Sequence, residues 1–377
     1  MPFLTGLKSL ASGFGPKKKR SSAHDPQNHD YPPSQNGPNY QELVDTRPPL
    51  VPVMLPRVHP KRHFALSDQG WTTIDMNTNS SDALYTSYQE LLKSSKAFFD
   101  LPMEEKETFK TALGSEDGWS RVEGEKEFIT LRSLESTPEV LKEATIKYWS
   151  EAGGLLNEIL VRIAESLGLP EESFTVYSEP CSRLVEKTAT MLRLFRYEGF
   201  EGKQSKVVAE AHRDLGLLSL VVGDTPGLEV HDRHRNWSFP IERTYETPSQ
   251  TVLVGRQLER MTNSRYRAGG HLVRSYPNPE PGKTDVPNHP DSRQYRYSIV
   301  FVLRAHYPIP INTDALTTPI TGEFSNPMRD ITAGDLFKKI HAAHYNINTA
   351  VEERNEQKRK LDEEKRKKTS QNGTPPS

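Results

Sequence analysis

Apolar side chains in the first half of the chain recur at helical spacing. In Asp82–Phe99 they fall three and four positions apart, which predicts an amphipathic helix. A second, short helix is expected to start at Pro102, a residue that suits a first-turn position. Thr137 is the expected N-cap of a long helix that runs to about Leu167 and packs one apolar face against a sheet. The apolar positions of that helix are Leu141, Tyr148, Ala152, Leu155, Ile159, Ile163 and Leu167.

The hydrophobic period changes after residue 189. Thr190–Tyr197 alternates apolar and polar side chains and is the first clear strand. Strands then alternate with turns as far as Leu303, which predicts a double-stranded β-helix of the jelly-roll or cupin-like type. The pattern becomes helical again around Ala333–Phe337, and Glu352–Lys368 is almost wholly charged, as in a solvated helix or a disordered tail. The fold class is therefore α+β.

These patterns divide the chain into four parts. Residues 1–47 are rich in Pro, Ser, Gly and Asn and are expected to be disordered. Residues 48–186 form a mainly helical region that packs on the barrel, residues 187–312 form the barrel itself, and residues 313–377 form a helical extension with a charged tail. The total of 377 residues is enough for one large domain with tails.

Composition narrows the expected class of protein. The formal net charge of -1 gives no reason to expect nucleic acid as a partner. The single cysteine, Cys181, rules out an internal disulfide framework and fits a reducing compartment, where it is expected to be an inert thiol. With no signal-peptide pattern and no long apolar run, no membrane association is expected. We therefore expect a cytoplasmic protein, with nuclear import through Pro16–Arg20 as an alternative, and leave its oligomeric state open.

The candidate chemistry begins with His212 and Asp214. Residues two apart on a strand project to the same side, so the imidazole and the carboxylate would form a chelating pair. A histidine from a distant strand, for which His271 is the natural candidate, would complete a facial triad. Two histidines and one carboxylate leave three adjacent positions open on Fe(II). Two other histidine pairs, His231 with His234 and His341 with His344, are interpreted as surface residues.

The residues around this triad resemble a known family. After His212-x-Asp214 come Gly227-Leu228-Glu229-Val230, Trp237, Thr262-Asn263, His271 and Arg296-x-Ser298, in an order and spacing similar to those of the iron(II)- and 2-oxoglutarate-dependent dioxygenases of the isopenicillin-N-synthase-like group. An independent stretch, Phe98-Phe99-Asp100-Leu101-Pro102-Met103-Glu104-Glu105-Lys106, resembles the Phe-Phe-x-Leu-Pro-x-Glu-Glu-Lys segment of the same group.

The resemblance implies a cofactor, a co-substrate and a reaction. Fe(II) would be held by His212, Asp214 and His271, and 2-oxoglutarate would chelate two of the open positions and leave one for O2. Arg296 suits the far carboxylate of 2-oxoglutarate, Ser298 faces the same way, and Tyr197 occupies the place of a tyrosine that often contacts the co-substrate. The implied reaction hydroxylates, desaturates or cyclises a small organic molecule, as in secondary metabolism, and releases succinate and CO2.

Two alternatives remain open at this point. One is an oxidase like isopenicillin N synthase itself, in which the Arg-x-Ser pair holds substrate and 2-oxoglutarate is not used. The other is a degenerate barrel that binds a small molecule or partner without oxidative chemistry. Three departures from the group's pattern bear on the choice: Arg256 replaces an Asp, Leu272 replaces an Arg, and the Pro-rich connection 275–294 is unusually long and is either a lid or a disordered insertion.

Overall fold

The computed structural model of the chain describes residues 45–78, 81–113, 115–178, 184, 187–199, 205–276 and 295–371. Most of the expected N-terminal tail, the basic segment Pro16–Arg20, Cys181 and nearly all of the Pro-rich connection lie outside these residues.

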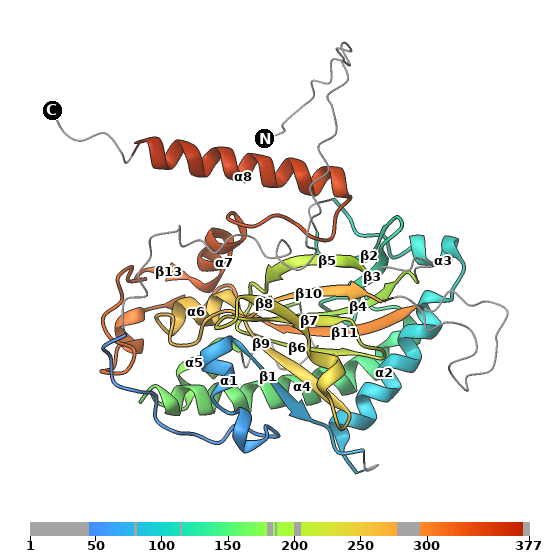
Figure 1. Cartoon of the computed structure of the whole chain (residues 1–377). Helices are drawn as coiled ribbons and strands as arrows, with labels where there is room; N and C mark the ends of the chain where they lie inside the picture. Colours follow the sequence, from blue (N-terminus) through green and yellow to red (C-terminus); the bar gives the residue numbers. More distant parts are fainter. Residues whose placement is uncertain are drawn as a thin grey trace.

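Two facing antiparallel sheets form the centre of the molecule (Figure 1). A seven-stranded sheet has the order β1-β9-β6-β11-β4-β3-β2, and a four-stranded sheet has the order β5-β10-β7-β8. The non-consecutive neighbours are those of a double-stranded β-helix, so the predicted α+β fold with a jelly-roll core is confirmed. The strands are β1 (Trp71–Asp75), β2 (Gly118–Val122), β3 (Lys126–Leu131), β4 (Met191–Tyr197), β5 (Lys206–Arg213), β6 (Leu218–Gly223), β7 (Leu228–Asp232), β8 (Trp237–Pro240), β9 (Ser249–Val254), β10 (Gly270–Ser275) and β11 (Arg296–Leu303), with a small separate pair β12 (Pro310–Ile311) and β13 (Ile331–Thr332).

The N-terminal region is less purely helical than its sequence pattern indicated. Strand β1 pairs with β9, and β3 pairs with β4, so this region extends the larger sheet on both edges. The division drawn near residue 187 therefore does not coincide with a boundary in the sheet. Strand β3 escaped notice because all six of its residues are buried, and a strand buried on both faces loses the alternation that marks a half-exposed one.

Helices cover the outer face of the larger sheet. The helices α2 and α4 run beneath that sheet in Figure 1. Trp149 of α4 packs edge-on against Phe301 of β11 at 5.0 Å between ring centres, and Phe99 of α2 lies 6.2 Å from Tyr297. Aromatic contacts of this kind fix the sheet to its helical layer. The helices are α1 (Ala65–Gln69), α2 (Ala83–Phe99), α3 (Met103–Glu107), α4 (Glu139–Ser166), α5 (Glu172–Ser178), α6 (Arg256–Met261), α7 (Ala333–His341) and α8 (Val351–Gln371).

The starts of the two long helices differ from each other. Asp82 caps α2 by accepting hydrogen bonds from the backbone N–H groups of Leu84 and Tyr85. The predicted N-cap of α4 was wrong. Pro138 precedes the first helical residue without a side-chain cap, and the Thr137 hydroxyl instead donates to the carbonyl of Ser133. Proline is well suited to this end of the helix because it has no backbone N–H to satisfy.

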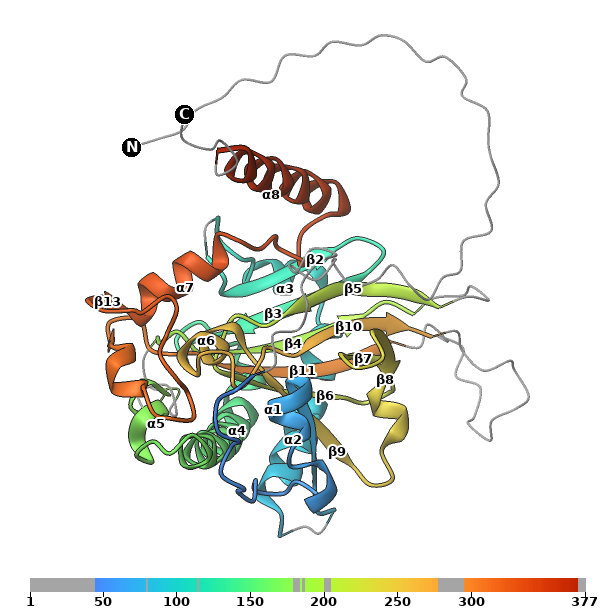
Figure 2. The same ribbon diagram turned by 60° about the vertical axis from the view of Figure 1, so that its left-hand side comes forward.

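The charged C-terminal stretch forms α8, which lies on the four-stranded side of the barrel, above β5 (Figure 2). Its expected full solvation was wrong for the first turns. Arg354 is only 2% exposed and donates to Glu125 at 2.6 Å, while Lys358 contacts Glu210 of β5. The sequence pattern concealed this contact because a single buried arginine in a charged run leaves no apolar period. In the described part of the chain, no helix is both long and apolar enough to cross a membrane.

The space between the two sheets has its own apolar cluster, separate from the helix-covered core. It contains Val122, Phe128, Phe195, Tyr197, Val208, Ala209, Val221, Leu228, Val230, Ile241, Leu253 and Val273. Inward-facing positions on opposite sheets supply these side chains. The candidate functional residues surround this cluster.

Candidate functional site: a metal triad and an anion pocket inside the barrel

The three predicted metal ligands lie together at one end of the barrel. Strands β5 and β10 pair so that His271 is directly opposite His212, with 4.2 Å between the ring centres. Asp214 follows at the end of β5, and its Oδ1 lies 3.6 Å from Nε2 of His212 and 3.9 Å from Nε2 of His271. One ligand atom from each residue falls within 4.8 Å of the other two, which is close enough for all three to bind one ion.

Backbone contacts orient both imidazoles toward this common point. Nδ1 of His212 lies 2.8 Å from the carbonyl oxygen of Glu210, and Nδ1 of His271 lies 3.3 Å from that of Gly269. A carbonyl oxygen can only accept, so each Nδ1 carries the proton and donates it. Each Nε2 is left with a free lone pair directed at the carboxylate, which is the tautomer that a metal needs.

The electrostatics of the triad favour a metal over a proton. Burial, followed by the neighbouring His271, holds the pKa of His212 well below its usual value, so the ring is neutral. Burial opposes ionisation of Asp214, but the neighbouring imidazoles outweigh it and hold the pKa of that carboxyl below its usual range. Oδ2 of Asp214 is buried and has no hydrogen-bond partner among the described residues. Two neutral imidazoles and a carboxylate with an unpaired oxygen fit Fe(II).

Arg296, Ser298 and Tyr197 meet deeper in the same barrel. Tyr197 of β4 is opposite Arg296 of β11, and the guanidinium lies 5.4 Å from the centre of the tyrosine ring. Burial raises the pKa of Tyr197 to about 12, so its hydroxyl stays neutral and can donate. Nη1 of Arg296 and Oγ of Ser298 are both buried without a hydrogen-bond partner in the described structure. Unpaired donors of this kind are costly unless an anion satisfies them, so this end of the barrel fits the far carboxylate of 2-oxoglutarate.

The remaining nitrogens of Arg296 are held by the protein. Nε donates to the carbonyl of Thr225 at 2.9 Å, and Nη2 donates to Glu242 at 2.9 and 3.1 Å. Glu242 lies in the short 3-10 helix Ile241–Thr244, and its Oε2 also accepts the backbone N–H groups of Gly227 and Leu228. A Cβ atom on Gly227 would fall 2.4 Å from Nε of Arg296, so this position leaves room for no other residue.

Sequence reasoning missed two further cations that face the barrel interior. Arg193 precedes Phe195 and Tyr197 by two and four positions on β4, so it shares their inward face. Lys126 of β3 is opposite Tyr197 and is completely buried. The alternation of Arg193 with two aromatic residues was a usable signal. Lys126 gave none, because its strand does not alternate. Glu242 gave none either, because it approaches Arg296 only through the folding of a distant turn.

The structure also places Arg256, which departs from the family pattern, and the histidines His231 and His234, which were not expected to bind a metal. Arg256 starts α6, where its guanidinium pairs with Glu259 at 2.8 Å and its backbone N–H donates to the Asp214 carbonyl. The ligand strand thus keeps a backbone support without the family's Asp. His234 is exposed and lies 2.7 Å from Asp68, whereas His231 belongs to β7 and is half-buried, contrary to its predicted surface position.

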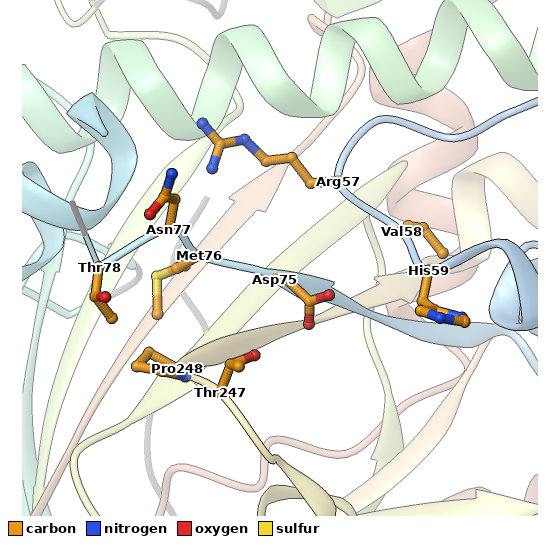
Figure 3. Close-up of a pocket in the computed structure, with 9 residues that line it drawn as sticks. All are labelled: Arg57, Val58, His59, Asp75, Met76, Asn77, Thr78, Thr247 and Pro248. Carbon is orange, nitrogen blue, oxygen red and sulfur yellow. The ribbon is translucent and has the colours of Figure 1, made fainter. Parts of the chain in front are cut away.

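An open groove of about 630 Å³ lies on the outside of the barrel (Figure 3). Its walls come from the ends of β1 and β9 and the segment before η1 (Pro60–Arg62), with Asp75, Met76 and Pro248 among them. None of the triad residues lines it. We therefore place the candidate chemistry in the barrel and not in this groove.

Comparisons with known proteins agree with this site. No family model matches the chain. It is 28% identical over 194 residues to probable flavonol synthase 5 of Arabidopsis thaliana, an alignment that covers 47% of this chain and 57% of that protein. It is 25% identical over 290 residues to the 2-oxoglutarate-dependent dioxygenase ecdK of Aspergillus rugulosus, covering 65% of this chain and 82% of that one. The similarity to these relatives supports the iron(II)- and 2-oxoglutarate-dependent dioxygenase superfamily.

A solved structure shares the fold of this chain. A full-length Neurospora crassa protein, crystallised in complex with alpha-KG, superposes with a TM-score of 0.57 at 19% identity and covers 73% of this chain and 87% of that one. At this level of identity the likeness concerns the fold. The chain thus shares its fold with a protein solved in complex with alpha-KG, and it has a triad of side chains suited to an iron ion.

Proposed function

We propose that the protein is a non-haem dioxygenase that uses Fe(II) and 2-oxoglutarate to oxidise a small organic molecule. The observation that carries the proposal is the position of two kinds of unsatisfied groups in one barrel. The metal triad has an unpaired carboxylate oxygen at one end, and Arg296 and Ser298 have unpaired donors at the other. A metal ion would satisfy the triad, and a molecule that chelates this ion and carries a distant carboxylate would satisfy the donors.

Each residue of the site has a task in this reaction. His212, Asp214 and His271 would hold the metal, with the imidazoles fixed by their Nδ1 hydrogen bonds. Nη1 of Arg296 and the Ser298 hydroxyl would donate to the far carboxylate of 2-oxoglutarate. When bound, the metal and 2-oxoglutarate supply the oxidising power, by a reaction with O2 that converts 2-oxoglutarate into succinate and CO2. The apolar lining between the sheets limits water around these groups.

The two alternatives are less well supported. Among the relatives, one is named as a 2-oxoglutarate-dependent dioxygenase, and a solved structure of the same fold is a complex with alpha-KG. A degenerate binding barrel would not need the complete ligand set together with a buried, unpaired guanidinium nitrogen. The chemistry of the site leaves hydroxylation, desaturation and ring closure as possible outcomes for the prime substrate.

The experiment that tests the proposal needs no prime substrate. Fe(II) and 2-oxoglutarate are added anaerobically to the full chain, and the weak visible charge-transfer band of the chelate is recorded. We expect a band in the wild type, no band in Asp214→Ala, and a requirement for more 2-oxoglutarate in Arg296→Met. Asp314→Ala is the matched control, because this exposed carboxylate pairs with Arg329 on the surface. Bound iron without a band would favour the 2-oxoglutarate-independent oxidase, and absence of bound iron would favour the degenerate barrel.

A further inference from the structure

The guanidinium of Arg193 is a second cation inside the barrel. Its Nε donates to the hydroxyl of Thr130 at 2.8 Å, and its Nη2 contacts the sulfur of Met191 at 3.5 Å. The guanidinium carbon lies 5.4 Å from the ring centre of Phe128 and 6.0 Å from that of Phe195. The side chain is only partly covered by these neighbours, so a molecule inside the barrel can reach it.

Arg193 forms no ion pair with any carboxylate in the described part of the chain. The acids close enough to influence it are Glu116 and Asp214. Glu116 is already paired with Arg304 at 2.7 Å and with Arg132 at 3.7 Å, and Asp214 belongs to the metal triad. Burial lowers the pKa of Arg193, but a guanidinium keeps its charge in proteins. A largely buried cation without a carboxylate partner is expensive, and an anionic ligand would offset that cost.

Arg193 lies apart from Arg296, the residue proposed to bind the far carboxylate of 2-oxoglutarate. Arg193 is opposite Val300 on β11, whereas Tyr197 is opposite Arg296. Four residues of strand correspond to about 13 Å. Leu218, four residues after Asp214, is opposite Leu303, at the end of β11 that is farthest from Arg296. Arg193 therefore lies near the metal end of the barrel, and Arg296 lies near the other end.

Lys126 adds to the positive charge beside the aromatic wall. Its Nζ lies 6.0 Å from the ring centre of Phe195, and it donates to the carbonyls of Val208 and Ile347 at 3.3 Å each. Burial lowers the pKa of Lys126 to about 7. As with Arg193, no described carboxylate comes within ion-pair distance of it. The paired residues Phe128 and Phe195 thus lie between Lys126, which is opposite Tyr197, and Arg193, which is opposite Thr130.

We propose that Arg193 binds the carboxylate of the prime substrate, and that this substrate is a small monocarboxylic acid with an aromatic or aliphatic body held against Phe128 and Phe195. The inference rests on the proposed function. A planar guanidinium with one edge already used by Thr130 offers its other nitrogens to a carboxylate. A phosphate group would call for more donors than this single guanidinium provides. With its carboxylate at Arg193, the body of the acid lies beside the metal ligands.

The test compares acids with their neutral amides. The full chain is loaded anaerobically with Fe(II) and 2-oxoglutarate, and the visible band is recorded first. The probes are 3-phenylpropanoate with 3-phenylpropanamide, and octanoate with octanamide, titrated by calorimetry. We expect each acid to bind the wild type at least about tenfold more tightly than its amide, because a charge-assisted hydrogen bond is lost in the amide.

Substitutions then assign this preference to Arg193. Arg193→Met should abolish the preference for the acid and leave the 2-oxoglutarate requirement of the band unchanged. Arg193→Lys keeps the charge but not the planar geometry, so it should retain a reduced preference, and it decides the matter if the methionine variant does not fold. Arg162→Met removes an exposed arginine of α4 that pairs with Glu165 and should bind both probes as the wild type does.

Three results would overturn the inference. The first is equal binding of acid and amide, or failure of both acids to bind a wild-type complex that shows the band. The second is a preference for the acid that survives in a folded Arg193→Met variant. If that variant does not fold, an undiminished preference in Arg193→Lys has the same meaning. The third is weaker 2-oxoglutarate binding in that methionine variant, which would place Arg193 in the co-substrate site. Absence of the band in the wild type would instead refute the proposed function itself.

Discussion

Glu242 and Arg296 form a buried ion pair at the point where the co-substrate carboxylate is expected. Nη2 of Arg296 lies 2.9 Å from Oε2 of Glu242, and both side chains are almost fully covered. The pair leaves Nη1 of the arginine unsatisfied. A dianionic co-substrate would therefore approach a guanidinium whose charge is already partly neutralised.

This pair predicts the effect of Glu242→Gln on co-substrate binding. The glutamine oxygen can still accept the N–H groups of Gly227 and Leu228, but the negative charge beside the incoming carboxylate is gone. We expect the Kd for 2-oxoglutarate to fall by about tenfold, the size of a like-charge repulsion at a partly shielded site. Titration of the visible band measures it. A rise in Kd would mean instead that Glu242 serves mainly to position the guanidinium.

Tyr197→Phe tests the hydroxyl without removing the ring under the guanidinium. The ring keeps its place opposite Arg296, 5.4 Å from the guanidinium carbon, but the neutral O–H donor is lost. We expect 2-oxoglutarate to bind about threefold to tenfold more weakly, with the metal content unchanged. Wild-type affinity in this variant would assign Tyr197 to packing alone.

Acid stability should depend on Glu116. Burial by itself would raise the pKa of this carboxyl, but the charges of Arg304 and two further arginines outweigh burial and lower the pKa from 4.5 to about 2. The folded pKa is below the unfolded one, so the stabilisation is complete above about pH 4.5 and is lost as the pH falls toward 2. Urea unfolding across this range should show a smaller loss of stability in Glu116→Gln than in the wild type. Equal slopes of stability against pH would contradict the prediction.

Arg354 should secure α8 to the barrel. It is buried against Glu125 and lies 3.5 Å from Glu210, two residues before the ligand His212 on β5. Arg354→Met leaves the Glu125 carboxylate buried without its partner, so we expect the free energy of unfolding to fall by about 3 kcal/mol. Amide hydrogen exchange in α8 should also become faster.

Arg359 offers a matched control on the same helix. Its ion pairs with Glu356 and Glu363 are exposed, so Arg359→Met should change the free energy of unfolding by less than about 0.5 kcal/mol. Similar losses of stability in the two variants would show that the buried ion pair of Arg354 stabilises the protein no more than the exposed ion pairs of Arg359.

Local patterns in the sequence were sufficient for several parts of the fold and the site. The helix at Asp82–Phe99 follows from its apolar spacing and from a capping carboxylate, both of which are local properties. The pairing of His212 with Asp214 follows from the two-residue repeat of a strand. The order of the motifs was enough to suggest His271 as the third ligand, although its distance from the other two is a tertiary property.

Other parts could not be read from local pattern. Strand β3 is buried on both faces and does not alternate, and the first turns of α8 are held by one buried arginine in a charged run. In both segments the structure depends on the residues that pack against the segment, and the local sequence does not show these residues. The same holds for Arg193, whose importance comes from the absence of an ion pair with any described carboxylate and not from any motif.

The sequence by itself determined the class of barrel, the ligand types and the residues proposed for the co-substrate, because strand period and residue chemistry are properties of short segments. Only the tertiary structure decided which charges are neutralised. Glu242 meets Arg296 across 54 residues of chain, whereas Arg193 meets no described carboxylate at ion-pair distance. Coulomb energy depends on distance and burial in the folded state, and neither can be read from the spacing of residues along the chain.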